Sequence, residues 1–107
     1  MLFKFKSKAT GDLIMLEPNG RRVLDIIGKS PETSGIIEPL QMARAIQALE
    51  LAIRTEEAAR NAAVESARSR GDDPPAGEVV SLRQRATPFI EMLRRCEKAE
   101  APIVWGV

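Results

Sequence analysis

The sequence predicts an α+β domain in which a small sheet pairs the N- and C-terminal strands and about three helices cover it. Two observations predict the sheet. Phe3 and Phe5 alternate with lysines near the start of the chain, and residues 103–107 are rich in strand-forming side chains. A third observation predicts the helical layer: residues 39–68 contain no Gly, carry Pro only at the first position, and place apolar side chains at helical spacing.

Size and composition describe one globular domain over residues 1–107. Its 44% hydrophobic and 29% charged residues are ordinary values, and the length suffices for a single core. The net charge of +1 creates no overall field that would attract nucleic acid or an anionic membrane. No apolar run approaches the roughly 18 residues of a membrane span. We therefore expect a cytoplasmic protein with no membrane partner.

The most informative chemical feature is the complete absence of histidine. It removes the usual general base, the Ser/His and Cys/His nucleophile pairs, and the commonest transition-metal ligand. Cys96 is the only cysteine, so no disulfide can form within the chain, which fits a reducing compartment. Cys96 falls on an apolar helical stripe and is interpreted as a small buried hydrophobe. We expect no catalytic residue set, no metal site and no cofactor.

The first strand is expected over residues 2–6, with its lysines pointing to water. Lys4, Lys6 and Lys8 allow two interpretations: a row that binds phosphate groups, or charges that keep an edge strand from pairing with another molecule. The second is favoured because no glycine-rich loop or helix start with phosphate-binding spacing accompanies them.

The sequence does not decide whether residues 13–20 form a strand or a helix. The apolar run 13–16 favours a short strand or an irregular core segment, and Pro18 fits either a β-turn or the first turn of a helix. A helix that ends at Gly28 follows. Arg21 and Arg22 at its start form either an anion clamp or, as we favour, part of a solvated face.

The central helix carries its large apolar side chains on one stripe at steps of four, three and four: Met42, Ile46, Leu49 and Ile53. Beyond this stripe, alanines and a single Val64 replace the large side chains. A helix continued to Arg68 would be about 45 Å long and would outrun a domain of this size. There are two alternatives. The last turns of the helix fray into the linker that follows, or the face of small alanine side chains packs closely against another helix, which could belong to a second subunit. The candidate interface residues are Ala59, Ala63 and Val64.

A flexible linker is expected at about residues 69–79, where two prolines and two glycines occur. Ser81 and Gln84 match a capping box and predict a helix start. Pro88 then predicts either a kink near Arg85 or a restart with Thr87 as the new cap. The closing strand is expected to pair with the first.

Several segments together resemble a small bacterial family known as domain of unknown function eighteen-forty, found mainly in proteobacteria. The resemblance covers nearly the whole chain and implies a compact α+β domain, but it implies no activity and no site residues. The segments that carry it are residues 5–9, 12–16, 24–28, 42–53, 81–93 and 104–105, of which 5–16 and 81–93 are the most specific.

Three functional hypotheses follow, in order of preference. The first is a non-enzymatic interaction or regulatory module that acts through its helical surface, as a homodimer or with another protein. The second is a nucleic-acid-binding module that uses Lys4, Lys6, Lys8, Arg21 and Arg22, which requires the first strand and first helix to share one face. The third is an enzyme or small-ligand binder with Asp12, Glu17 or Cys96 in a cleft.

Overall fold

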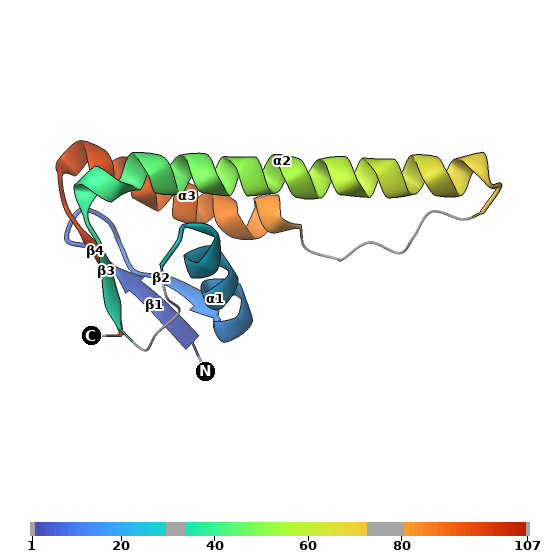
Figure 1. Ribbon diagram of the computed structural model, residues 1–107. Helices are drawn as coiled ribbons and strands as arrows, with labels where there is room; N and C mark the ends of the chain where they lie inside the picture. Colours follow the sequence, from blue (N-terminus) through green and yellow to red (C-terminus); the bar gives the residue numbers. More distant parts are fainter. Residues whose placement is uncertain (1, 30–33, 73–80, 107) are drawn as a thin grey trace.

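The computed structural model describes residues 2–29, 34–72 and 81–106. One four-stranded sheet is covered on one face by three helices, and a long helix extends beyond the sheet (Figure 1). The elements in chain order are β1 Leu2–Lys6, β2 Leu13–Leu16, α1 Glu17–Ile26, β3 Gly35–Ile37, α2 Pro39–Ser69, α3 Leu82–Ala99 and β4 Ile103–Trp105.

The sheet has the strand order β2-β1-β4-β3, and all its neighbours are antiparallel. Phe5 faces Trp105 across the β1–β4 pair, so the predicted pairing of the terminal strands is confirmed. Residues 13–16, which the sequence left undecided between strand and helix, form a strand with Leu13 opposite Phe5. Strand β3 was not expected from the sequence, because its three residues are too few to show a period. The α+β fold class is confirmed.

The covered face of the sheet is held together by aromatic side chains. The ring of Phe5 lies 4.8 Å from that of Phe89 on α3 and 6.0 Å from that of Trp105. Two glycines allow close approach at this face. A Cβ on Gly20 of α1 would lie 2.7 Å from the Phe3 ring, and a Cβ on Gly35 would collide with the Trp105 ring. Gly20 therefore lets α1 pack closely over the sheet, and Gly35 makes room for the Trp105 ring on the neighbouring strand.

Helix α1 begins directly after β2, with Pro18 in its first turn and not in a β-turn. Pro is tolerated there because the first N–H groups of a helix have no intrahelical partner. Gly28, with φ of +80°, ends the helix as predicted. The Lys29 N–H donates to the Leu24 carbonyl at 2.9 Å and the Gly28 N–H to the Asp25 carbonyl at 3.1 Å, which is a Schellman cap.

Helix α2 is one continuous element of 31 residues, so its last turns do not fray into a linker. Its four large apolar side chains face the core, and Met42 and Leu49 are fully buried. The Cα radius of gyration is 16.0 Å, against about 13 Å for a compact domain of 100 residues. The C-terminal half of α2 projects past the start of α3 (Figure 1), so the helix does outrun its core.

Helix α3 begins with the predicted capping box. The Gln84 N–H donates to the Ser81 hydroxyl at 3.2 Å, and the Ser81 N–H donates to the Gln84 side chain at 3.1 Å. The helix continues through Pro88, so the predicted alternative of a restart at Thr87 is wrong; Thr87 instead donates its hydroxyl hydrogen to the Arg83 carbonyl within the same helix. Cys96 is fully buried, as its position on the stripe predicted.

The segment between α2 and α3 is described only at its start. Ser69 is still helical, and Gly71, with φ of +75°, follows the C-cap residue Arg70. The Asp72 N–H donates to the Ala67 carbonyl at 2.9 Å and completes a second Schellman cap. The rest of the linker predicted at about 69–79 lies outside the described residues.

Candidate interaction surfaces

Helix α2 has a second uncharged face besides the one in the core. We name it the α2 outer stripe, and its spacing is four, three, four, three and four, the heptad spacing of a helix that packs against another helix. The small side chains let the axes of two helices come close together. The stripe consists of Ala48, Ala52, Thr55, Ala59, Ala62 and Ser66.

The N-terminal part of the α2 outer stripe lines an open hollow of about 670 Å³ between α1 and α2. Ile26 of α1, Leu51 of α2 and Leu82 of α3 add large apolar side chains to this hollow. Leu51 is 58% exposed, so it adds accessible apolar surface to this hollow. The hollow ends at about Ala59, and from there the stripe continues along the half of α2 that projects past α3 in Figure 1.

Glu56 lies where α1, α2 and the start of α3 meet. Its carboxylate accepts a hydrogen bond from the Leu82 backbone N–H at 3.1 Å and one from Arg22 at 2.9 Å, and Arg60 lies 3.5 Å away. The Leu82 N–H is one of the unpaired donors at a helix start, so the carboxylate acts as an additional cap. The pKa of Glu56 is lowered, first by the Leu82 hydrogen bond and then by Arg22, against the opposing effect of burial.

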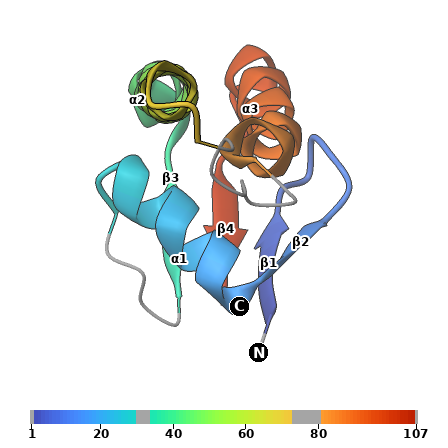
Figure 2. The ribbon, with the colours of Figure 1, turned by 90° about the vertical axis from the view of Figure 1, so that its right-hand side faces the viewer.

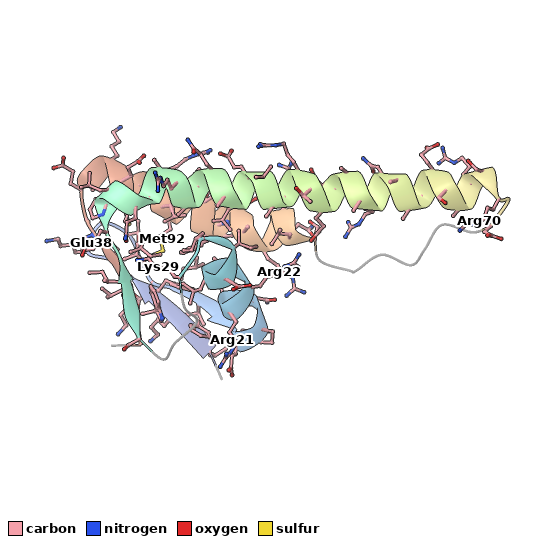
Figure 3. All side chains as sticks on the ribbon, viewed as in Figure 1. Arg21, Arg22, Lys29, Glu38, Arg70 and Met92 are labelled. Atoms are coloured by element: carbon pink, nitrogen blue, oxygen red, sulfur yellow. The ribbon has the colours of Figure 1, made fainter. Side chains whose placement is uncertain are left out.

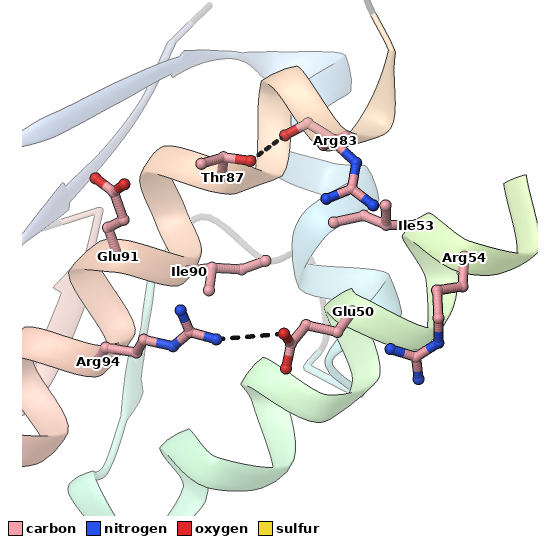
Figure 4. Close-up of a pocket in the computed structure, with 8 residues that line it drawn as sticks. All are labelled: Glu50, Ile53, Arg54, Arg83, Thr87, Ile90, Glu91 and Arg94. Carbon is pink, nitrogen blue, oxygen red and sulfur yellow. Dashed lines mark hydrogen bonds and ion pairs between the residues drawn. The ribbon is translucent and has the colours of Figure 1, made fainter. Parts of the chain in front are cut away.

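A charged groove of about 280 Å³ separates α2 from α3 (Figure 4). Arg94 donates to Glu50 at 3.2 Å across it. At one end, Arg83 donates two hydrogen bonds to Glu57 at 2.7 and 2.9 Å. This forked contact lowers the pKa of Glu57 and raises that of Arg83. Most of these charges already have partners on the facing helix, so the ion pairs hold α2 and α3 together. The groove therefore offers little unpaired charge to a ligand.

The basic residues proposed for nucleic-acid binding lie on different parts of the molecule. Lys4 and Lys6 alternate with the core-facing phenylalanines, so they belong to the face of the sheet that the helices leave open. Arg21 and Arg22 lie on α1, on the covered side (Figure 3). Arg21 pairs with Glu17 at 2.9 Å and Arg22 with Glu56 at 2.9 Å. The fold therefore does not bring the strand and the helix to one basic face; Lys8 lies in the exposed loop after β1.

The three residues proposed as an interface lie on different sides of α2. Ala59 lies on the α2 outer stripe and is exposed. Ala63 is exposed at the border of the stripe, while Val64 is half-buried and lies eleven residues after Ile53, on the core-facing side of the helix. Sequence reasoning found the alanines but missed the repeat that starts at Ala48. The spacing of small residues was the signal that could have shown it.

None of Asp12, Glu17 and Cys96 lines the hollow between α1 and α2 or the groove between α2 and α3. Asp12 is exposed at the start of β2, Glu17 is tied to Arg21, and Cys96 has no exposed surface. Within residues 2–29, 34–72 and 81–106, no three acidic or cysteine side chains group in a way that could hold a metal ion. Over the same ranges, no helix has the length and apolar character needed to cross a bilayer.

Fold and surfaces together define a small α+β protein with three helices over one face of a four-stranded antiparallel sheet and an exposed uncharged stripe on α2. The chain belongs to the family described as domain of unknown function DUF1840, whose profile matches residues 1–105. This agrees with the family resemblance seen in the sequence. Neither the comparison with curated proteins nor that with solved structures gave a match.

Proposed function

We propose that the protein is a non-enzymatic interaction module that forms a homodimer through the α2 outer stripe. The observation that carries the proposal is the second uncharged face of α2, which repeats at heptad spacing from Ala48 to Ser66 and which the described parts of the chain leave uncovered beyond Ala59. A helix with one buried stripe normally presents polar side chains elsewhere. The proposal places the module in the cytoplasm, which the single cysteine supports, and in a bacterium, as the family resemblance implies.

A two-fold antiparallel arrangement centred near Ala59 suits this stripe. Ser66 and Ala52 both lie seven residues from Ala59, so each would face the other in the partner copy. The projecting half of one α2 would then lie over the hollow between α1 and α2 of the other copy. Leu51 and the hollow would be covered, and the stripe residues beyond Ala59, which the described parts of the chain leave exposed, would gain a packing partner.

The test is the mass of the full chain in solution, measured by light scattering after size-exclusion chromatography. We expect the wild-type protein to have twice the mass of one chain. Ala59→Glu and Ala62→Glu place a charge in the middle of the stripe and are expected to give the single-chain mass, because a buried unpaired charge is strongly unfavourable. Circular dichroism would establish that both variants keep their helices.

Asn61→Glu is the matched control. Asn61 is exposed and lies between Ala59 and Ala62 in sequence but on another side of the helix. The control should keep the double mass. The proposal fails if the wild-type protein has the mass of one chain, or if the two stripe variants keep the same mass as the control.

A further inference from the structure

Strand β2 forms an edge of the sheet and differs from the usual guarded edge. Within the described parts of the chain it pairs with β1 alone. Its four residues Leu13–Leu16 are all apolar, and Ile14 and Leu16 are 52% and 61% exposed. Natural edge strands usually carry lysine, proline or a bulge that prevents pairing with another molecule. The basic residues that we assigned to this role in the sequence lie in and after β1, an inner strand, and not in β2.

A groove of about 280 Å³ runs along this strand. Its other side is made by Arg85 and Pro88 of α3, and Asn19 of α1 lies at one end. Figure 2 shows β2 at the outer side of the sheet, below α3. A strand added to β2 would therefore have one row of side chains directed toward α3 and the other toward solvent beside Ile14 and Leu16.

Arg85 gives the groove a specific charge. Two arginines are half-buried in the described parts of the chain, Arg60 and Arg85. Arg60 has Glu56 as a counter-charge at 3.5 Å, whereas Arg85 donates its hydrogen bond to the neutral amide oxygen of Asn19. No carboxylate in the described ranges forms an ion pair with Arg85. A partly desolvated guanidinium favours a carboxylate, which it can bind through two parallel hydrogen bonds.

We infer that the groove binds an extended apolar segment of a partner protein by strand addition to β2, with a carboxylate of that segment on Arg85. Backbone hydrogen bonds along β2 would supply affinity, and the Arg85 contact would fix the direction and position of the segment. This site and the α2 outer stripe share no residue, so the inference does not depend on the proposed homodimer.

The probe is a pool of synthetic peptides of about eight residues, with Val, Ile, Leu or Phe at alternate positions and Thr between them. One pool ends in a free carboxylate, and its twin ends in an amide. Binding to the full wild-type chain is measured by titration, together with the backbone amide shifts of the protein in NMR spectra. We expect the acid pool to bind about tenfold more tightly than the amide pool, with the largest shifts at Leu13–Leu16 and Arg85.

Two variants and one control sharpen the test. Arg85→Gln should lower the affinity for the acid pool about tenfold, to that of the amide pool. Ile14→Lys places a guarding charge on the edge and should weaken both pools. Ile36→Lys, on the opposite edge strand, is the control and should change neither.

Three results would overturn the inference. One is the absence of binding by either pool to the wild-type chain. Another is equal affinity for acid and amide, or for the wild-type protein and Arg85→Gln. The third is self-pairing of the edge: if Ile14→Lys converts a wild-type dimer to single chains while Ala59→Glu does not, β2 binds a second copy of the chain. That last result would also contradict the α2 homodimer, whereas the first two leave it untouched.

Discussion

The two halves of α2 are continuous in the backbone but differ in what stabilises them. The first half carries Met42, Leu49 and Ile53, which are at most 4% exposed in the core beneath α2. The second half, from Ala58 to Ser69, carries mostly small, exposed side chains and extends past α3 (Figure 1). Helix formation is thus a local property of both halves, whereas burial of large apolar area belongs to the first alone.

Local interactions account for the helical state of the projecting half. Alanine has the best helix propensity, and several of them occur in succession. Glu65 pairs with Arg68 at 3.3 Å, and the Schellman cap at Gly71 satisfies the last carbonyls. Exposed pairs of this kind contribute a few tenths of a kcal/mol each. The projecting half should therefore respond weakly to changes that would be severe in the first half.

The largest effect is expected from truncation of the buried stripe. Leu49→Ala removes a fully buried side chain and should lower the free energy of unfolding by about 2 to 5 kcal/mol. Val64→Ala, in the projecting half, should cost less than about 1 kcal/mol because Val64 is only half-buried. Urea unfolding of both variants measures the difference. Similar losses for the two would show that the projecting half is packed as tightly as the first.

An intermediate effect is expected at Glu56, where the packed half ends. Glu56→Gln should cost about 1 to 2 kcal/mol at pH 7, because the charged acceptor for the Leu82 N–H and Arg22 is lost. Since the folded pKa is below the ordinary value of 4.5, the carboxylate contributes stability above pH 4.5. That contribution disappears as the pH falls through the lower folded pKa.

Urea unfolding from pH 7 down to pH 3 checks this pH dependence. The gap between the wild-type protein and Glu56→Gln should close toward the acid end of the series. Glu91→Gln serves as the control, since Glu91 is exposed and forms no ion pair in the described parts of the chain. A gap at Glu56 that stays constant with pH would show that the ionised carboxylate is not the stabilising group.

The smallest global effect is expected at the far end of α2. Gly71→Ala forces a side chain into a left-handed conformation that costs an alanine about 1 kcal/mol. Hydrogen exchange of the amides in the last two turns should accelerate about fivefold, while the global free energy of unfolding changes little. Gly11→Ala is the control, because Gly11 is not at a positive φ and a Cβ there would meet nothing within 4 Å. Unchanged exchange near Ser66 would mean that this end is held by something other than its cap.

Local patterns allowed much of the fold to be predicted. The alternation of Phe3 and Phe5, the capping residues Ser81 and Gln84, and the stop at Gly28 act within a few residues of chain, and each appears in the structure. Candidate site residues were harder to predict. From the sequence, Arg22 was predicted to be a solvated or anion-binding residue. In the structure it pairs with Glu56, which lies 34 positions away in the sequence.

By itself, the sequence determined most of the segments that become helix or strand and which side of each is apolar, because turns of backbone hydrogen bonds and side-chain periods are local. Strand β3 and the state of residues 13–20 were not determined in this way. Only the tertiary structure decided what those sides meet. It placed β2 at one edge of the sheet, beside Arg85, and β3 at the opposite edge. It also placed the start of α3 beside the middle of α2, so that α3 does not cover the C-terminal half of α2. The physical reason is that strand order and helix packing depend on contacts between distant segments, and an apolar pattern does not specify its partner.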